Sequence, residues 1–230
     1  MNRVLITGSS RGIGLELVRQ YLNSGWRVDA CCRKPDSHEE LQQLAADNQQ
    51  LNLHPLDVTN LDQTRELAHT LQGEAIDVFI NNAGIMGDRR SDFGNLDRSS
   101  WQEVLSINTI APAMLTELFL GHVEASQAKT FVYITSKVGS IADNQSGHMM
   151  MYRTSKTALN MVVKNIAIQT RARGIKAVCL HPGWVQTDMG GPNALISPQT
   201  SVQGMRKVIQ DLTLEKSGNF YNYDGTPIPW

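Results

Sequence analysis

The chain has 230 residues, a formal net charge of −1 and a sequence pI of about 6.6, which suits one α/β domain with a full-sized core. This charge gives no broad electrostatic basis for binding nucleic acid or an anionic membrane, and the interrupted apolar runs predict no membrane-spanning segment. The start MNRVLITG lacks signal-peptide features, and Cys31, Cys32 and Cys179 form no CxxC or metal-ligand pattern, so we expect a cytoplasmic protein with free thiols and no bound metal.

Strand-like and helix-like segments alternate along almost the whole chain. The expected strands are 3–8, 27–32, 51–57, 76–82, 130–136, 176–183 and 219–225, and the expected helices are 13–25, 39–48, 61–72, 101–123, 152–174 and about 200–213. This alternation predicts a parallel sheet covered by helices on both faces. The expected fold is therefore α/β, a single-domain Rossmann-like doubly wound parallel sheet of about seven strands spanning residues 1–230.

A glycine-rich turn, TGSSRGIG (7–14), follows the first expected strand. Gly8, Gly12 and Gly14 permit a tight turn and a close approach of a diphosphate to backbone N–H groups, and the helix beginning near Ile13 offers its positive end. The spacing GxxxGxG is a variant of the dinucleotide-binding pattern. Turns use glycine for conformational reasons alone, but the position between a strand and a helix favours nucleotide binding.

The end of the second expected strand indicates which nucleotide binds. It reads Cys32-Arg33-Lys34, without the acidic residue that usually binds the adenosine ribose hydroxyls. Asp29 lies about 10 Å back along the strand, which is too far to serve. Arg33 and Lys34, with Arg11 of the glycine-rich turn, suit a 2′-phosphate, although a solvated basic turn is the alternative. We therefore expect NADP(H) to be preferred over NAD(H).

The stretch YRTSK places Tyr152 and Lys156 on one helix face, about 6 Å apart along the axis. An isolated pair of this kind is more often a surface helix with a partly buried tyrosine. The alternative is a proton donor whose pKa is lowered by the neighbouring ammonium.

Four signals in chain order carry a resemblance to a known family: TGSSRGIG, NNAG (81–84), an isolated Ser136 at a strand end, and YRTSK. Together they resemble the short-chain dehydrogenase/reductase family, in its classical branch, over essentially the whole chain. The stretches YRTSK, HPGWVQTDMGG (181–191) and NFYNYDGTPIPW (219–230) are most similar to the C-factor-like and sniffer-type carbonyl reductases.

The resemblance implies catalytic roles for four residues. Tyr152 would be the general acid in carbonyl reduction, or the base in alcohol oxidation, and Lys156 would lower its pKa and bind the nicotinamide ribose. Ser136 would hold the substrate oxygen beside the tyrosine hydroxyl. Asn108 would shape a water-linked proton path to the lysine, where a buried asparagine satisfied by backbone is the other interpretation.

The resemblance also implies cofactor contacts. Asp57 would accept from the adenine amino group, Asn81, Ala83 and Gly84 would lie against the adenosine side, and Val185 and Thr187 would bind the nicotinamide carboxamide. The full expected cofactor set is Gly8, Ser10, Arg11, Gly12, Ile13, Gly14, Arg33, Asp57, Val58, Asn81, Ala83, Gly84, Tyr152, Lys156, Pro182, Gly183, Val185 and Thr187.

Two loops bear on the substrate. Ser136 and Tyr152 are a few positions further apart than is common in the family, and the extra residues fall in DNQSGHMMM (143–151). Met149 to Met151 either fill a core or line a soft pocket, and His148 is expected to be an exposed loop residue. The short, glycine-rich segment around 187–200 is expected to be the substrate lid. We therefore expect a permissive pocket for small or medium aldehydes and ketones.

The expected function is NADPH-dependent reduction of a carbonyl to an alcohol. Two alternatives stay open: a dinucleotide-binding signalling protein of C-factor type, and an alcohol or steroid dehydrogenase working in the oxidative direction. The apolar periodicity of 101–123 and 152–174 predicts a homodimer or homotetramer. The expected partner is otherwise a small carbonyl or alcohol substrate, without nucleic acid or membrane.

Overall fold

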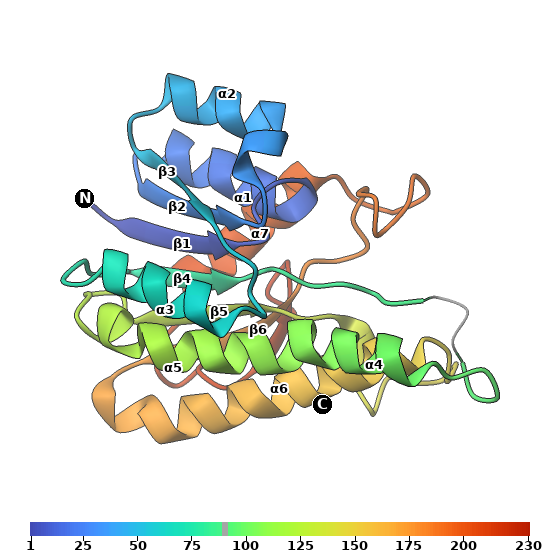
Figure 1. The fold of residues 1–230 in the computed structure, drawn as a ribbon. Coiled ribbons are helices and arrows are strands. Elements are labelled where there is room, and N and C mark those ends of the chain that lie inside the picture. The colour runs from blue at the N-terminus through green and yellow to red at the C-terminus, as the bar shows by residue number, and fades with distance from the viewer. Residues whose placement is uncertain (89–91) are drawn as a thin grey trace.

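The computed structural model describes residues 1–88 and 92–230 and contains a seven-stranded sheet in the order β3-β2-β1-β4-β5-β6-β7 (Figure 1). The strands are Arg3–Thr7 (β1), Arg27–Cys32 (β2), Leu51–Pro55 (β3), Val78–Asn81 (β4), Thr130–Ile134 (β5), Lys176–His181 (β6) and Phe220–Asn222 (β7). Neighbouring strands all pair in parallel. The predicted doubly wound parallel sheet is thus confirmed.

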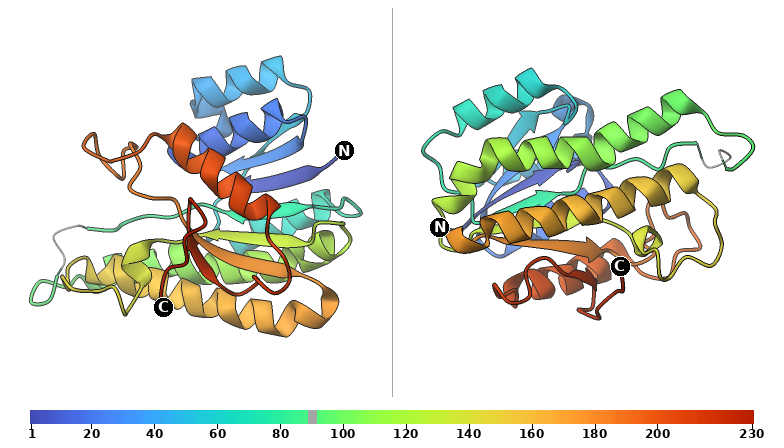
Figure 2. Two further views of the ribbon diagram at one scale, coloured as in Figure 1. Left: turned by 180° about the vertical axis from the view of Figure 1, so that it is seen from behind. Right: turned by 90° about the horizontal axis from the view of Figure 1, so that it is seen from below.

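The helices lie on both faces of the sheet (Figures 1 and 2). They are Gly12–Asn23 (α1), Glu39–Asp47 (α2), Leu61–Thr70 (α3), Arg98–Leu105 (α4), Ala111–Glu124 (α5), Met150–Thr170 (α6) and Pro198–Gln210 (α7). A π-helical turn, Ser106–Ile110 (η2), joins α4 to α5, and short 3₁₀ turns occur at Pro35–Ser37 (η1), Lys137–Gly139 (η3) and Arg171–Arg173 (η4). The helix expected at 101–123 therefore begins earlier than predicted and contains a π-helical turn.

Alternation along β1 divides the interior into two cores. Val4 and Ile6 face the core under α1, α2 and α7, whereas Leu5 faces the core under α3, α5 and α6. Successive side chains of a strand point to opposite faces, so a strand buried on both sides is apolar throughout. This explains why β1 reads as a continuous apolar run rather than as alternating apolar and polar residues.

The strand order reverses direction between β1 and β4, because the chain first builds outward through β2 and β3 and then returns to the other side of β1. Ligands of open α/β sheets bind outside the carboxyl ends of the strands at such a switch point. The glycine-rich turn follows β1 and the NNAG stretch ends β4, so the fold brings these two motifs together.

Among the described residues, the run Arg98–Glu124 is long and apolar enough to cross a membrane by length and composition, with a hydropathy of 1.4. The sequence analysis did not predict such a run. Leu115, Phe119 and Val123 of this run are fully or almost fully buried in the core beneath α5. A core helix of a sheet protein passes the same test, so the finding is weak evidence for a membrane span.

Candidate active site

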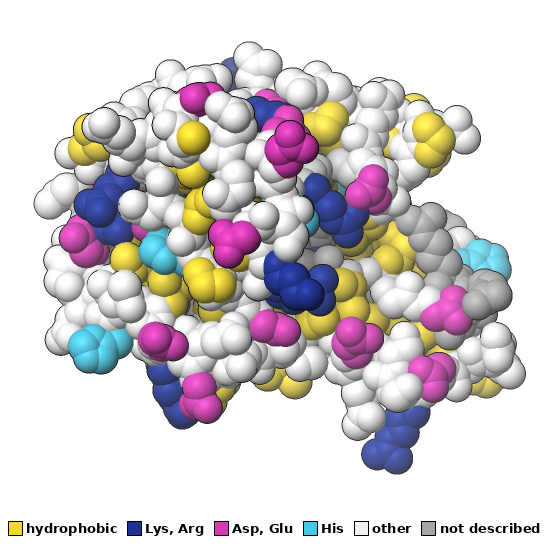
Figure 3. Space-filling model, turned by 45° about the horizontal axis from the view of Figure 1, so that its top comes forward, with side chains coloured by type: hydrophobic (Ala, Val, Ile, Leu, Met, Phe, Trp, Pro, Cys, Tyr) yellow, Lys and Arg dark blue, Asp and Glu magenta, His cyan; other side chains and the backbone are white. Residues whose placement is uncertain are grey.

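A cavity of about 680 Å³ opens at the carboxyl ends of the strands. Its wall begins at the glycine-rich turn after β1, continues through the segments that follow β2, β3 and β4, and reaches Tyr152 and Lys156 of α6. Figure 3 shows a hollow with apolar side chains on its floor and Lys and Arg side chains beside it. The shape is an elongated site with a glycine-rich end and a tyrosine–lysine end.

The glycine-rich turn forms a cradle that larger residues would fill. A Cβ built on Gly14 would lie 2.1 Å from the carbonyl oxygen of Gly8, and a Cβ on Gly8 would lie 2.8 Å from the Cα of Ala83. The helix α1 begins beside the cavity at Gly12, and its N-cap residue Arg11 makes no side-chain capping hydrogen bond. Close backbone approach and a helix N-terminus together fit a diphosphate.

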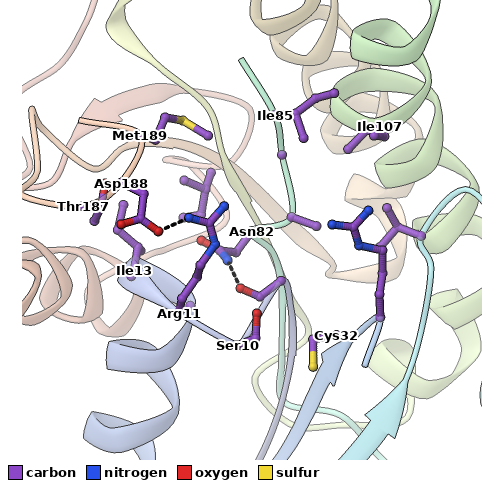
Figure 4. Close-up of a pocket in the computed structure, with 18 of the residues that line it drawn as sticks. Ser10, Arg11, Ile13, Cys32, Asn82, Ile85, Ile107, Thr187, Asp188 and Met189 are labelled. Atoms are coloured by element: carbon purple, nitrogen blue, oxygen red, sulfur yellow. Dashed lines mark hydrogen bonds and ion pairs between the residues drawn. The ribbon is translucent and has the colours of Figure 1, made fainter. Parts of the chain in front are cut away.

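Asn82 braces this cradle, a role that the sequence analysis did not assign. Its side-chain amide donates to the carbonyl oxygens of Thr7 at 2.9 Å and Gly8 at 3.0 Å (Figure 4). The Thr7 hydroxyl in turn accepts from the backbone N–H groups of Asn82 and Ala83. The NNAG motif therefore fixes the turn after β1 as well as ending β4. The presence of this motif in the sequence could have indicated the bracing role of Asn82.

Arg33 and Asp57 line the cavity where the segments after β2 and β3 meet. Hydrogen bonds from the hydroxyl and N–H of Thr59 lower the pKa of Asp57, with a smaller contribution from the charge of Arg33. Cys32 also lines this end, whereas Lys34 is not part of the wall. The cation expected at the end of β2 is therefore present as Arg33.

Arg11 lines the cavity and has an acidic partner that the sequence analysis did not predict. Its guanidinium forms an ion pair with Asp188, in the loop after β6, and Figure 4 shows the two side chains facing each other across one side of the cavity. The prediction grouped Arg11 with Arg33 and Lys34 as one cluster of cations. In the structure Arg11 and Arg33 both line the cavity, Lys34 does not, and the carboxylate of Asp188 pairs with Arg11.

Asp29 lies in a buried cluster on the third position of β2, outside the cavity wall. Its fully buried carboxylate accepts from Arg3 Nε at 2.6 Å and Asn52 Nδ2 at 3.1 Å, and pairs with His54 Nε2 at 2.8 Å. Burial raises the pKa of Asp29, but the hydrogen bonds and charges of His54 and Arg3 together outweigh burial and lower it to about 2. Asp29 therefore has structural partners and is not positioned to bind a ribose.

Tyr152 and Lys156 both line the tyrosine–lysine end of the cavity, so the pair is not a surface feature of α6. Lys156 is 4% exposed, and its Nζ donates to the carbonyl oxygen of Ile134 at 3.0 Å. The same Nζ lies 5.6 Å from the centroid of the Tyr152 ring. The last residue of β5 thus anchors the ammonium beside the phenol.

Burial controls the protonation of this pair. Burial raises the pKa of Tyr152 to about 12, and a hydrogen bond with Ser136 acts in the opposite direction. Burial lowers the pKa of Lys156 to about 8. The sequence analysis predicted a lowered pKa for Tyr152, and the structure shows the reverse direction, because the loss of water around the phenol outweighs its polar neighbours.

Ser136 is held against α6 by the turn that follows it. The N–H of Val138 points to the Ser136 hydroxyl at 3.4 Å, and a Cβ on Gly139 would lie 2.9 Å from the Cβ and carbonyl carbon of Lys156. The hydroxyl of Thr157 donates to the Gly139 carbonyl at 2.9 Å. The turn η3 therefore packs directly on the helical residue that supplies the ammonium.

Asn108 is fully buried in the π-helical turn η2 and connects β4 to α6. Its Oδ1 accepts from the Ile85 N–H at 2.9 Å, and its Nδ2 donates to the Ile85 carbonyl at 2.8 Å and to the Ser155 hydroxyl at 3.0 Å. A Cβ on Gly84 would lie 3.2 Å from Asn108 Oδ1 and 3.4 Å from Lys156 Nζ. Helical π-turns frequently occur at functional sites, and this one places Asn108 close to the ammonium.

The structure brings most of the expected cofactor set to the cavity wall. The residues that line it are Gly8, Ser10, Arg11, Gly12, Ile13, Gly14, Arg33, Asp57, Val58, Ala83, Gly84, Tyr152, Lys156, Pro182 and Thr187. The residues that lie outside the lining are Asn81, Gly183 and Val185 of the cofactor set, together with Ser136 and Asn108. Lining residues that the sequence analysis missed include Ile85 and Ile107, and also Gln186 and Met189, which lie in the quoted stretch HPGWVQTDMGG (181–191) but were given no role there.

The loop with extra residues has a mixed character. Met151 is 1% exposed and belongs to the interior, whereas Met149 and Met150 are half-buried. His148 is exposed, as expected, and its Nδ1 lies 2.9 Å from Asp92 Oδ2. The three methionines therefore do not act as one unit, since the start of α6 rotates them to different sides.

Comparisons with known proteins agree with this geometry. The family described as short chain dehydrogenase matches residues 2–195. The C-signal protein of Myxococcus xanthus is 41% identical over 155 residues, covering 67% of this chain and 93% of that protein. Among solved structures, the carbonyl reductase Sniffer of D. melanogaster has a TM-score of 0.94 and 33% identity over 100% of both chains. The NADPH-bound carbonyl reductase from chicken fatty liver has a TM-score of 0.94 and 36% identity, covering 100% of this chain and 99% of that chain.

Proposed function

The chain belongs to the short-chain dehydrogenase family, and from this membership we propose that it reduces small aldehydes or ketones to alcohols with NADPH. An oxidoreductase acting on alcohol and carbonyl groups follows from the family and from its similarity to carbonyl reductases. One observation carries the proposal further. A single cavity joins a glycine cradle to Tyr152 and Lys156, so a bound dinucleotide would extend from one to the other.

The residues along the cavity fit NADP(H) part by part. The cradle of Gly8, Gly12 and Gly14 and the start of α1 would hold the diphosphate. Arg33 would bind the 2′-phosphate, and Asp57 would accept from the adenine amino group. The similarity to an NADPH-bound carbonyl reductase supports this choice of cofactor.

The nicotinamide end would be positioned by several segments. Lys156 would contact the ribose and Thr187 would hold the carboxamide, since both line the cavity, and the backbone of Val185, just outside the lining, would assist. Asn108 would keep the end of β4 and the ammonium in place through its bonds to Ile85 and Ser155. When bound there, the cofactor supplies a hydride to the carbonyl carbon.

Tyr152 would donate the proton that completes the reduction. Its raised pKa, about 12, keeps the phenol protonated near neutral pH, as a general acid requires. Ser136 would share the carbonyl oxygen of the substrate with the phenol, since its hydroxyl is close enough to the phenol to oppose the rise of the Tyr152 pKa. Lys156, with a pKa of about 8, is largely cationic at pH 7 and would stabilise the phenolate left after proton transfer.

The segment 187–200 would act as a short substrate lid. Its two ends are joined by a bridge between Val185 and Ile196 and by a hydrogen bond of 2.9 Å from the Gln186 N–H to the Ile196 carbonyl. Leu195 is 78% exposed, whereas Thr187, Asp188 and Met189 line the cavity, so the lid presents both polar and apolar side chains to the site. A short lid of this kind favours small or medium carbonyl substrates.

Two further parts of the proposal concern partners. Ile110, Met114, Met161 and Ile168 are exposed on the run from η2 through α6, which supports assembly into a homodimer or homotetramer.

The 41% identity to a C-signal protein supports a second candidate function, a signalling role for the protein with its dinucleotide bound. A Tyr152→Phe variant that lost biological activity together with reductase activity would link the signalling role to carbonyl reduction.

The test is NADPH consumption with a panel of aldehydes and ketones, comparing the wild type with Tyr152→Phe. We expect the variant to lose at least about 100-fold in kcat while it still binds NADPH, because only the proton donor is removed. Tyr133→Phe is the control for loss of a phenolic hydroxyl, since Tyr133 is fully buried and bonds to Thr116 in the core under α5. Retained turnover in Tyr152→Phe would contradict the proposed mechanism.

A further inference from the structure

The segment after β7 folds back and crosses toward the loop that follows Ser136. Tyr221 and Pro227 form an antiparallel bridge, and the Ile228 N–H donates to the Phe220 carbonyl at 2.9 Å. Figure 2 shows this segment, in dark red, ending beside α6. The last described residues are therefore fastened to the edge strand and directed at the active-site side of the sheet.

The ring of Trp230 packs on β7 and α6, and its carbonyl oxygen binds the loop that follows Ser136. Its ring stacks on Phe220, with centroids 5.7 Å apart and an interplanar angle of 26°, and the Nζ of Lys164 lies 6.0 Å from the ring centroid. Its carbonyl oxygen accepts from the N–H of Ala142 at 2.9 Å and from the hydroxyl of Ser140 at 3.3 Å. The ring is thus an anchor on β7 and α6, and the carbonyl is an attachment point for residues 140–142.

The loop attached in this way has little packing of its own. Residues 141–148 are all exposed, and Ile141 is 74% exposed. Arg153 of α6 donates to the carbonyl oxygen of His148, at the far end of the loop, and also to that of Val138 in the turn η3 that precedes the loop. The contact with Trp230 holds the near side, four residues after Ser136.

The attached residues connect directly to the catalytic side chains. Ser140 is 1% exposed and follows Gly139, which packs against the backbone and Cβ of Lys156. The same turn begins at Ser136, whose hydroxyl is close enough to Tyr152 to oppose the rise of its pKa. Movement of residues 140–142 would therefore shift the hydroxyl of Ser136 relative to the phenol and the ammonium.

We propose that Trp230 is a positioning residue, which holds the turn from Ser136 to Ala142 against α6 and so sets the position of Ser136 relative to Tyr152. Its catalytic consequence rests on the proposed carbonyl reductase function. Misplacement of a reacting group by about 1 Å can cost up to about 100-fold in rate, so an attachment remote from the chemistry can affect kcat. Cofactor affinity should not depend on Trp230, because the cradle and Arg33 lie elsewhere along the cavity.

The experiment compares Trp230→Ala with Trp230→Phe, which keeps an aromatic ring for stacking, and with Pro229→Ala, a change at the adjacent exposed residue. We expect Trp230→Ala to lower kcat at least about tenfold, with the NADPH dissociation constant within twofold of the wild type. Trp230→Phe and Pro229→Ala should stay within twofold in both quantities. Ser140→Ala, which removes one of the two bonds to the carbonyl, should have an intermediate effect on kcat.

Amide hydrogen exchange gives a second measurement that does not need catalysis. In Trp230→Ala the amides of residues 137–142 should exchange faster than in the wild type, with β1 and α1 unchanged. The positioning role would be overturned if these amides of Trp230→Ala exchanged at the wild-type rate. It would also be overturned if kcat and NADPH affinity fell together in this variant. A wild type that reduces no carbonyl would defeat the proposed function, while the exchange result would still decide whether Trp230 holds the turn.

Discussion

Replacing Lys156 by methionine should stabilise the folded protein at pH 7, although the lysine lies at the centre of the proposed mechanism. The side chain is 4% exposed, and burial lowers its pKa from 10.5 to about 8. Burying the charged form therefore costs free energy in the folded state. Methionine keeps a similar unbranched shape without the charge.

The magnitude follows from the pKa shift. A change from 10.5 to about 8 corresponds to about 3 kcal/mol of unfolding free energy at pH 7, at about 1.4 kcal/mol per unit. The variant leaves the Ile134 carbonyl without the Nζ donor, which costs about 1–2 kcal/mol. The net expectation is a gain of about 1–2 kcal/mol for Lys156→Met at pH 7.

The sign of the pH dependence is also defined. The folded pKa lies below the unfolded one, so between about pH 8 and 10.5 the unfolded chain binds more protons at this site. Wild-type stability from this group should rise with pH in that window, by about 2 kcal/mol from pH 7 to 9.5, whereas Lys156→Met lacks this contribution. The advantage of the variant should therefore disappear at the higher pH.

Urea unfolding of both proteins at pH 7 and 9.5 measures the two differences. Lys164→Met is the matched control, because Lys164 lies two turns later on α6, is half-buried and also donates one hydrogen bond to a backbone carbonyl, that of Gly218. The control should show no gain at pH 7 and no such pH dependence. A Lys156→Met protein less stable than the wild type at pH 7, or a difference that does not change with pH, would refute the reasoning.

Three other substitutions test the cradle, the buried cluster and the cofactor preference. Gly14→Ala should lower NADPH affinity at least about tenfold in a fluorescence titration, since its Cβ would lie 2.1 Å from a carbonyl oxygen. Gly121→Ala is the control and should leave NADPH affinity unchanged, because a Cβ there has nothing within 4 Å. Equal affinities of the two variants would count against the cradle. Asp29→Asn should cost about 2–3 kcal/mol at pH 7, the free energy that corresponds to the lowered pKa of Asp29 at about 1.4 kcal/mol per unit. Because the Asp29 pKa is lowered from 3.8 to about 2, the wild type should lose this stabilisation as pH falls from about 4 to 2, and a cost that persists at pH 2 would contradict it. Arg33→Gln should reduce kcat/KM for NADPH about tenfold and leave kcat/KM for NADH within twofold. Lys34 lies outside the cavity wall, so Lys34→Gln should change kcat/KM little with either cofactor. An equal loss with both cofactors in Arg33→Gln would exclude a role for Arg33 in the preference for NADPH.

The sequence predicts the fold well because the fold depends on local patterns. Apolar runs such as RVLIT, the glycine-rich turn and the alternation of strands and helices each specify their structure within a few residues. The π-helical turn at Ser106–Ile110 has no such local signal, because it depends on how α4 and the turn itself pack against α6. The prediction of one helix over 101–123 therefore missed both the earlier start at Arg98 and the π-helical turn within it.

The candidate site divides in the same way. Residues within motifs, such as Gly14 or Lys156, reach the cavity wall as predicted, because each motif fixes its own backbone. The ion pair of Arg11 with Asp188 was not predicted, because Asp188 lies far along the chain and only the folded structure brings the two together. The role of Trp230 was missed for the same reason, since nothing in PIPW indicates a contact with Ala142.

The protonation of Tyr152 shows why spacing alone was insufficient. Four-residue spacing places an ammonium near a phenol, but it does not reveal that both are buried, and burial favours the neutral form of each. A neutral phenol is the starting state for carbonyl reduction, whereas alcohol oxidation must begin from a phenolate. We infer that the protein by itself holds Tyr152 ready to donate a proton, and that oxidation would require additional stabilisation of the phenolate. The kcat of reduction should then stay constant across neutral pH, while the kcat of alcohol oxidation should rise with pH, and parallel profiles for the two directions would contradict this inference.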